Sequence, residues 1–183
     1  MKRAKFFERW ICAAALALLC AVMPSPAAAA SSSMDVTARV GFDAFSEVED
    51  FDLYEVNGRM VFSPYITWGD GWTLTPALVC AVSLLHAADD TGIMAGFGPQ
   101  LELTFPWDRL TAFATVRPSG LTEHEYGRED LGGWFTLATD VGARIDLGSR
   151  IMVGYAWEHI SNANLYDNNP GLNFHVIELG LKF

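Results

Sequence analysis

The sequence is poor in cysteine and in basic residues. Its 183 residues include three cysteines, and 12 Lys and Arg residues stand against 22 Asp and Glu residues. Only Cys80 follows residue 30, so a chain shortened there forms no internal disulfide. The formal net charge of −10 repels phosphate backbones. We therefore expect no nucleic-acid partner.

The first 30 residues have the three-part layout of a secretory signal peptide. Three basic residues within the first five positions precede an apolar stretch, and small residues follow up to Ala30. The apolar stretch, about 14 residues, is shorter than the roughly 20 that a membrane helix needs. We predict that residues 1–30 are a cleaved signal peptide and that residues 31–183 form one exported domain.

The rest of the chain also lacks a run long enough for a transmembrane helix, although 51% of all residues are hydrophobic. An apolar exported chain without such a helix spans lipid by closing a sheet, because every backbone polar group is then paired. The predicted class is all-β, an eight-stranded antiparallel transmembrane up-and-down β-barrel. Period-two alternation places its strands at residues 35–45, 53–68, 72–85, 92–105, 110–117, 133–146, 151–161 and 172–183.

The connections alternate between short turns and longer, more polar loops. In bacterial barrels the short turns face the periplasm and the long loops face outward. Both ends of the exported domain are therefore expected in the periplasm, and the protein is expected in the outer membrane of a Gram-negative cell. The turns are predicted at 69–71, 106–108 and 148–149, and the loops at 46–52, 86–91, 118–132 and 162–171.

The last two predicted strands have a clear register. Counting back from Phe183, alternate residues are apolar, and a final strand of this kind resembles the assembly signal of outer-membrane proteins. In these two strands, odd-numbered side chains therefore face lipid and even-numbered ones face the lumen. An eight-stranded barrel is filled by side chains. We expect a paired polar interior formed by Glu55, Arg59, Glu102, Arg117, Asp140, Arg144 and Glu158.

The same count places His159 and Ser161 on the lipid face. Polar side chains there cost free energy unless they lie near the interface or serve a function. Two positions apart in a strand, the side chains project on the same side, roughly 6.5–7 Å apart along the backbone. An imidazole and a hydroxyl at this spacing can act as general base and nucleophile. The spacing alone favours a structural His-x-Ser.

The residues around this pair resemble the signature of the lipid A 3-O-deacylase (PagL) family. The matching segments are residues 159–165 and 169–172, on the last two predicted strands. The resemblance implies an esterase that removes an acyl chain from lipopolysaccharide at the outer membrane, without metal or cofactor. It implies that His159 is the base and Ser161 the nucleophile. Loop or oxyanion roles are implied for Asn162, Ala163, Asn169 and Gly171.

One position departs from the family pattern. The family has a catalytic Glu fourteen residues after the His, where this chain has Asn173. Register places Asn173 on the lipid face beside His159. An amide oxygen can orient an imidazole but cannot stabilise an imidazolium by charge. The sequence thus leaves open a slow enzyme with Asn173 in the catalytic site, the use of another carboxylate such as Asp167, or a loss of hydrolysis.

Other interpretations remain open at this stage. A non-catalytic barrel with a structural or adhesive role and a phospholipase are the rival functions, and a homodimer is not decided by the sequence. His175 could join the site, although an interfacial His bonded across strands is the simpler interpretation. Residues 123–125 and 128–130 could bind a divalent cation, and a solvated loop explains the same residues.

Overall fold

The computed structural model describes residues 33–45, 48–64, 66–107 and 109–183. Within them, eight long antiparallel strands form one barrel, closed by the β1–β11 and β2–β4 pairings, which confirms the predicted fold class. The predicted signal peptide lies outside the described residues. The long strands are β1 (Ser33–Asp43), β2 (Asp52–Val61), β4 (Trp72–Ala87), β5 (Asp90–Thr104), β6 (Leu110–Leu121), β9 (Phe135–Asp146), β10 (Ile151–Ser161) and β11 (Leu172–Lys182).

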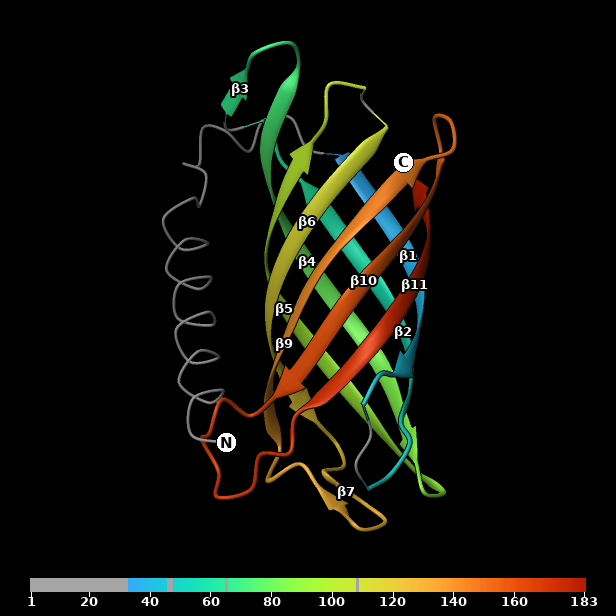
Figure 1. Ribbon diagram of the computed structural model, residues 1–183, viewed down its shortest axis with the longest axis vertical. Helices are drawn as coiled ribbons and strands as arrows, with labels where there is room; N and C mark the ends of the chain where they lie inside the picture. The colour runs from blue at the N-terminus through green and yellow to red at the C-terminus, as the bar shows by residue number, and fades with distance from the viewer. Residues whose placement is uncertain (1–32, 46–47, 65, 108) are drawn as a thin grey trace.

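The connections between the strands lie at two opposite ends of the barrel (Figure 1). The end that carries the C-terminus, here called the turn end, holds the β9–β10 turn and the short strand β3 (Ile66–Trp68). The other end, the loop end, holds the 162–171 loop and a small hairpin of β7 (Glu125–Tyr126) and β8 (Glu129–Asp130). The described residues include no helix that is long and apolar enough to cross a membrane.

Most element boundaries agree with the sequence prediction to within two residues, and three differences have a structural consequence. The strand expected at 53–68 is divided into β2 and β3, with Pro64 between them, which has no N–H for the ladder. Strand β6 continues to Leu121 instead of ending at residue 117. The loop expected at 86–91 is a tight turn, because Ala88 (φ 51°) and Asp89 (φ 68°) adopt the left-handed conformation of a two-residue hairpin.

The predicted alternation of faces is confirmed in the last two strands. On β11, Ile177, Leu179 and Leu181 are 54%, 57% and 52% exposed, whereas Glu178 and Gly180 between them are buried. The apolar odd-numbered side chains thus form part of the outer wall. Even-numbered side chains of β10 such as Glu158 point into the lumen and are buried as well.

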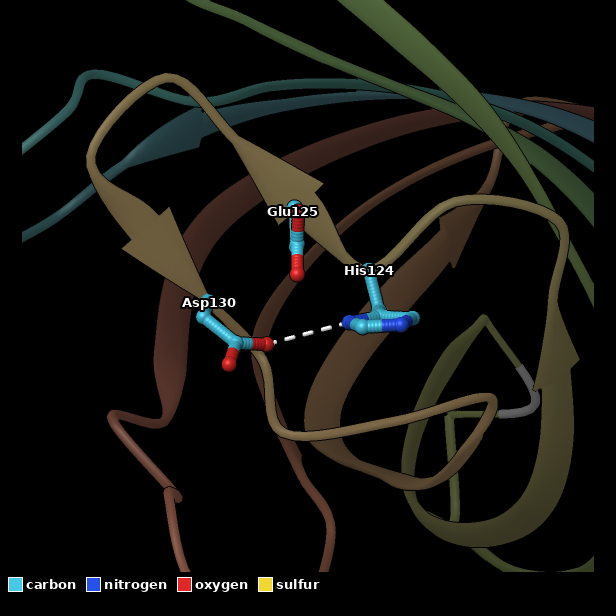
Figure 2. Close-up of side chains that lie close together, drawn as sticks. All are labelled: His124, Glu125 and Asp130. Atoms are coloured by element: carbon cyan, nitrogen blue, oxygen red, sulfur yellow. Dashed lines mark hydrogen bonds and ion pairs between the residues drawn. The ribbon is translucent and has the colours of Figure 1, made fainter.

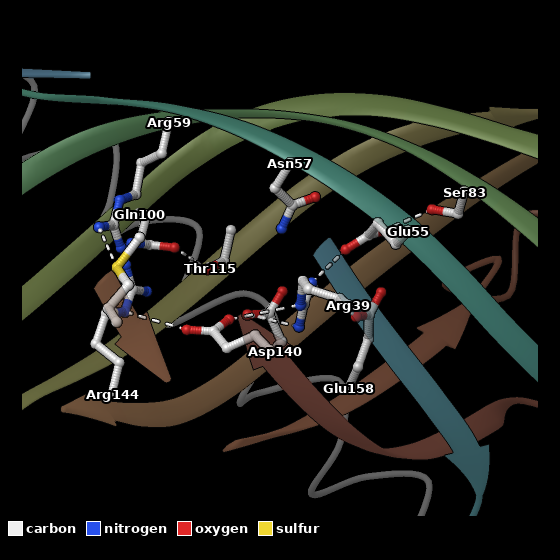
Figure 3. A network of polar contacts seen from close by, with 12 residues as sticks. Arg39, Glu55, Asn57, Arg59, Ser83, Gln100, Thr115, Asp140, Arg144 and Glu158 are labelled. Atoms are coloured by element: carbon white, nitrogen blue, oxygen red, sulfur yellow. Dashed lines mark hydrogen bonds and ion pairs between the residues drawn. The ribbon is translucent and has the colours of Figure 1, made fainter. Parts of the chain in front are cut away.

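The lumen is filled by a network of paired charges, as expected (Figure 3). Six buried carboxylates surround four buried guanidinium groups. Arg39 is bonded to Glu55 and lies 3.1 Å from Glu158, and Arg117 reaches the same two carboxylates at 3.1 and 2.7 Å. All seven charged residues expected in the interior are buried. The network also includes Asp35, Arg39 and Glu178.

Candidate active site on the outer wall

The candidate catalytic residues lie on two neighbouring strands at the loop end. Strands β10 and β11 pair antiparallel, and the register sets His159 directly opposite Asn173. This confirms the position expected for Asn173 beside His159. Ser161 is the last residue of β10, on the same face as His159, and both side chains are half-buried.

Among the described residues, the His159 side chain has one hydrogen-bond partner. Its Nδ1 atom lies 2.9 Å from Oδ1 of Asn173. An amide oxygen only accepts hydrogen bonds, so Nδ1 carries the proton and Nε2 is left with a free lone pair. Within the described part of the chain, the Ser161 hydroxyl makes no hydrogen bond, and so is not bonded to His159. The site therefore combines a base of fixed tautomer with an unengaged hydroxyl.

A tight turn ends β10 immediately after Ser161. The N–H of Leu165 donates to the carbonyl oxygen of Asn162 at 3.0 Å. Ala163 (φ 53°) and Asn164 (φ 61°) between them adopt the left-handed conformation, as in a type I′ turn. Ala163 is exposed at the tip of this turn.

Asn162 connects the 162–171 loop by hydrogen bonds to a neighbouring loop at the same end of the barrel. Its Nδ2 donates to the carbonyl oxygen of Leu131 at 2.9 Å and to that of Asn168. Its backbone N–H donates to Oδ1 of Asn169 at 3.0 Å. Both donor groups of Asn162, its backbone N–H and its Nδ2, are thus used. In the described residues the Nδ2 group of Asn169 has no acceptor, so it remains available to a ligand.

A small cavity of about 10 Å³ lies beside the candidate nucleophile and is lined by Ser161, Asn169 and Gly171 among others. Such a volume is about what one water molecule needs. Gly171 has φ +74°, and a Cβ atom built on it would lie 3.1 Å from Cε1 of His159. Glycine at this position therefore lets the chain pass against the imidazole ring.

A groove of about 240 Å³ adjoins Asn173 and is lined by three carboxylates, of which the sequence analysis singled out Glu129 alone. Asp43 ends β1 and accepts the N–H of Phe45 at 2.9 Å. Glu49 accepts hydrogen bonds from the side chain and backbone of Arg128, which lower the pKa of Glu49. Glu129 is the third carboxylate that lines the groove. No sequence spacing links these residues, because they come from separate segments.

Two other sequence candidates form no hydrogen bond with His159 in the described residues. Asp167 is exposed in the 162–171 loop. His175 forms a hydrogen bond of 2.6 Å between its Nδ1 and the hydroxyl of Tyr155, and its ring packs edge-on against Trp157 at 5.1 Å. His175 is therefore bonded across the strands, as its simpler interpretation expected.

Fold and site together define a transmembrane β-barrel that carries a polar His, Ser and Asn cluster on its outer wall. A family model for lipid A 3-O-deacylase (PagL) matches residues 38–182, a range that includes all of this cluster. The chain belongs to this family. The search of curated proteins found no match.

Solved structures show the same fold. A crystal structure of the outer membrane enzyme PagL is similar with a TM-score of 0.67 and 19% identity, over 80% of this chain and 97% of that chain. A de novo designed transmembrane β-barrel is similar with a TM-score of 0.52 and 10% identity, over 82% of this chain and 95% of that chain. At these identities the likeness concerns the barrel alone.

Proposed function

We propose that this protein is an exported outer-membrane esterase that hydrolyses the 3-O-linked acyl chain of lipid A. The observation that carries the proposal is the hydrogen bond from His159 to Asn173 beside the free hydroxyl of Ser161, on a face turned to lipid. Membership of the deacylase family supports the substrate class. An outward-facing site suits such a substrate, because its acyl chains already lie in the bilayer.

In the proposed mechanism, Ser161 Oγ attacks the ester carbonyl carbon while its proton passes to Nε2 of His159. The carbonyl oxygen becomes an oxyanion, and the free Nδ2 group of Asn169 is the side-chain donor placed to stabilise it. Collapse of this intermediate releases the sugar oxygen, which takes the proton from His159. Water then cleaves the acyl-serine ester, with His159 again acting as base.

Asn173 orients the imidazole in this mechanism but supplies no charge. In a serine protease, replacing the triad acid by its amide lowers the rate about 10⁴-fold. We therefore expect a slow enzyme, and we expect Asn173→Glu to accelerate it.

The test is mass spectrometry of lipid A after incubation with refolded protein in detergent. Wild type is expected to remove one hydroxyacyl chain, Ser161→Ala to remove none, and Asn173→Glu to react faster. Ser149→Ala serves as a matched control, because Ser149 is exposed in the β9–β10 turn at the opposite end of the same hairpin. Equal activity of wild type and Ser161→Ala would contradict the assignment of the nucleophile.

A second candidate function is a non-catalytic barrel derived from the enzyme scaffold. The observation that favours it is the neutral Asn173 at the position of the family's Glu. Activity that appears only in Asn173→Glu would support this rival. Release of fatty acid from phospholipid vesicles that contain no lipopolysaccharide would instead indicate a phospholipase.

A further inference from the structure

The β7–β8 hairpin at the loop end brings together three groups that ligate metals (Figure 2). The nitrogen or oxygen ligand atoms of His124, Glu125 and Asp130 all lie within 4.8 Å of one another. The hairpin register sets Glu125 directly opposite Asp130, and His124 precedes Glu125 in the chain. One imidazole and two carboxylates thus converge at the base of a small hairpin outside the barrel wall.

The spacing of these atoms fits a transition-metal ion. Imidazole nitrogen and carboxylate oxygen bind Zn²⁺ at about 2.0–2.2 Å, so two ligands of one tetrahedral ion lie roughly 3.3 Å apart. Nδ1 of His124 lies 3.0 Å from Oδ1 of Asp130. An ion between them would replace the proton that they share, with the imidazole protonated on Nε2 instead.

The charges around the hairpin also favour a bound cation. Carboxylates directly opposite on paired strands repel each other, and Glu125 and Asp130 stand in that relation. Residues 122–134 contain one Lys or Arg, which is Arg128. In the described residues Arg128 forms its ion pair with Glu49 instead. The opposed carboxylates therefore have no Lys or Arg partner within the described part of the chain.

Neighbouring groups hold the three ligands in place. Glu123 accepts the backbone N–H groups of His124 and Glu125 at 2.8 and 3.0 Å. The Trp134 ring packs edge-on against the His124 ring at 4.5 Å. The N–H of Gly132 donates to Asp130 at 2.7 Å, and this bond, together with His124, lowers the pKa of the Asp130 carboxyl. Such outer contacts orient metal ligands and keep a carboxylate ionised.

We infer that His124, Glu125 and Asp130 form a binding site for a divalent transition-metal ion such as Zn²⁺, with solvent at the remaining position. A donor set that includes imidazole selects such ions over Mg²⁺ and Ca²⁺, which prefer oxygen ligands alone. The site is separate from the proposed esterase chemistry and does not depend on it.

The metal site is connected to the loop that follows Ser161. Nδ2 of Asn168 donates to the carbonyl oxygen of Asp130, and Nδ2 of Asn162 donates to that of Leu131. An ion that fixes Asp130 therefore also fixes the acceptors on which the 162–171 loop rests. We expect Zn²⁺ to protect this loop from proteolysis.

The test measures Zn²⁺ binding to refolded protein in detergent by titration calorimetry, with Mg²⁺ and Ca²⁺ compared. Wild type is expected to bind one Zn²⁺, and His124→Ala and Glu125→Gln to weaken binding at least about tenfold. Glu125→Gln is included because the Glu125 side chain makes no hydrogen bond or ion pair in the described residues, so its loss leaves the hairpin fold intact.

His86→Ala is the matched control. His86 is exposed at the same end of the barrel and is bonded to Thr91, but it has no such cluster around it. Its replacement should leave Zn²⁺ affinity unchanged. The inference is overturned if wild type shows no saturable Zn²⁺ binding, if His124→Ala and Glu125→Gln bind as wild type does, or if Ca²⁺ binds equally tightly.

Discussion

Two adjacent residues of β10 show how differently the two faces of the barrel treat a polar side chain. Glu158 is fully buried in the lumen, 2.7 Å from Arg117 and 3.1 Å from Arg39. His159, on the outer wall, has the amide of Asn173 as its single side-chain partner in the described residues. Buried charges need several partners to be tolerated, whereas a sparsely bonded group remains open to a ligand. The comparison predicts that stability depends on the lumen and activity on the outer wall.

The largest effect is expected from His159→Ala. Removal of the general base should lower deacylation of lipid A at least about 10³-fold, because the nucleophile and its base act as a unit. The free energy of unfolding should change by only about 1 kcal/mol, the typical worth of one hydrogen bond. Initial rates by mass spectrometry and urea unfolding measure the two quantities. Near-normal rates in this variant would exclude His159 as the base.

Arg39→Met tests the other side of the comparison. Arg39 lies within 4 Å of carboxylate oxygens of Glu55, Glu158, Asp140 and Glu178. Its removal leaves buried carboxylates without compensation, which typically costs about 3–5 kcal/mol of unfolding free energy. The turnover of the folded fraction should stay the same.

Arg128→Met is the control for that experiment. The Arg128 side chain is 77% exposed and pairs with Glu49 on the surface, where ion pairs contribute little. Urea unfolding in lipid vesicles, followed by tryptophan fluorescence, should show a much smaller loss of unfolding free energy for Arg128→Met than for Arg39→Met. Equal losses of unfolding free energy in the two variants would mean that the lumen network does not stabilise the barrel.

Asn169→Asp separates loop support from catalysis on the outer wall. The substitution keeps the oxygen that accepts the Asn162 N–H but removes the Nδ2 donor. Loss of one oxyanion donor typically lowers kcat about 10²–10³-fold. We expect a fall of about 10²-fold in kcat with little change in KM, measured by steady-state kinetics on lipid A micelles. A change confined to KM would assign Asn169 to substrate binding instead.

The sequence predicts most of the barrel and the core of the candidate site because both follow from strand period. Alternation back from Phe183 places Ile177 outside and Glu178 inside, as the structure shows. The same register predicts that Asn173 lies beside His159, because a shift of one residue would turn every side chain of the strand to the other face.

The loop contacts follow no such period and could not be predicted. Asn162 reaches Leu131, which is 31 residues away in the sequence. A Cβ atom on Gly132 would lie 2.1 Å from the carbonyl oxygen of Asn168, so this glycine is required by a contact between two loops. The groove residues Asp43 and Glu49 likewise meet Asn173 through tertiary packing. Only three-dimensional contacts reveal these constraints.

The smallest expected effect, and the finest test of the outer wall, is Gly171→Ala. A residue with a Cβ atom at φ +74° costs roughly 1–2 kcal/mol of backbone strain. The added methyl also presses on the His159 ring, because it would lie 3.1 Å from Cε1. We expect the free energy of unfolding to fall by about the amount of this backbone strain. We expect the rate of deacylation to fall about tenfold, since a displacement of 1 Å in a catalytic group can lower rates up to 10²-fold.

Gly148→Ala distinguishes these two causes. Gly148 also has a positive φ (117°), but a Cβ atom there would have no neighbour within 4 Å. It lies in the β9–β10 turn, at the opposite end of β10 from the 162–171 loop. Gly148→Ala should therefore lose stability without losing activity. If both variants lose activity equally, then backbone strain, and not contact with His159, explains the glycine at position 171. The activity would then depend less on contacts of the His159 ring than the comparison of Glu158 and His159 implies.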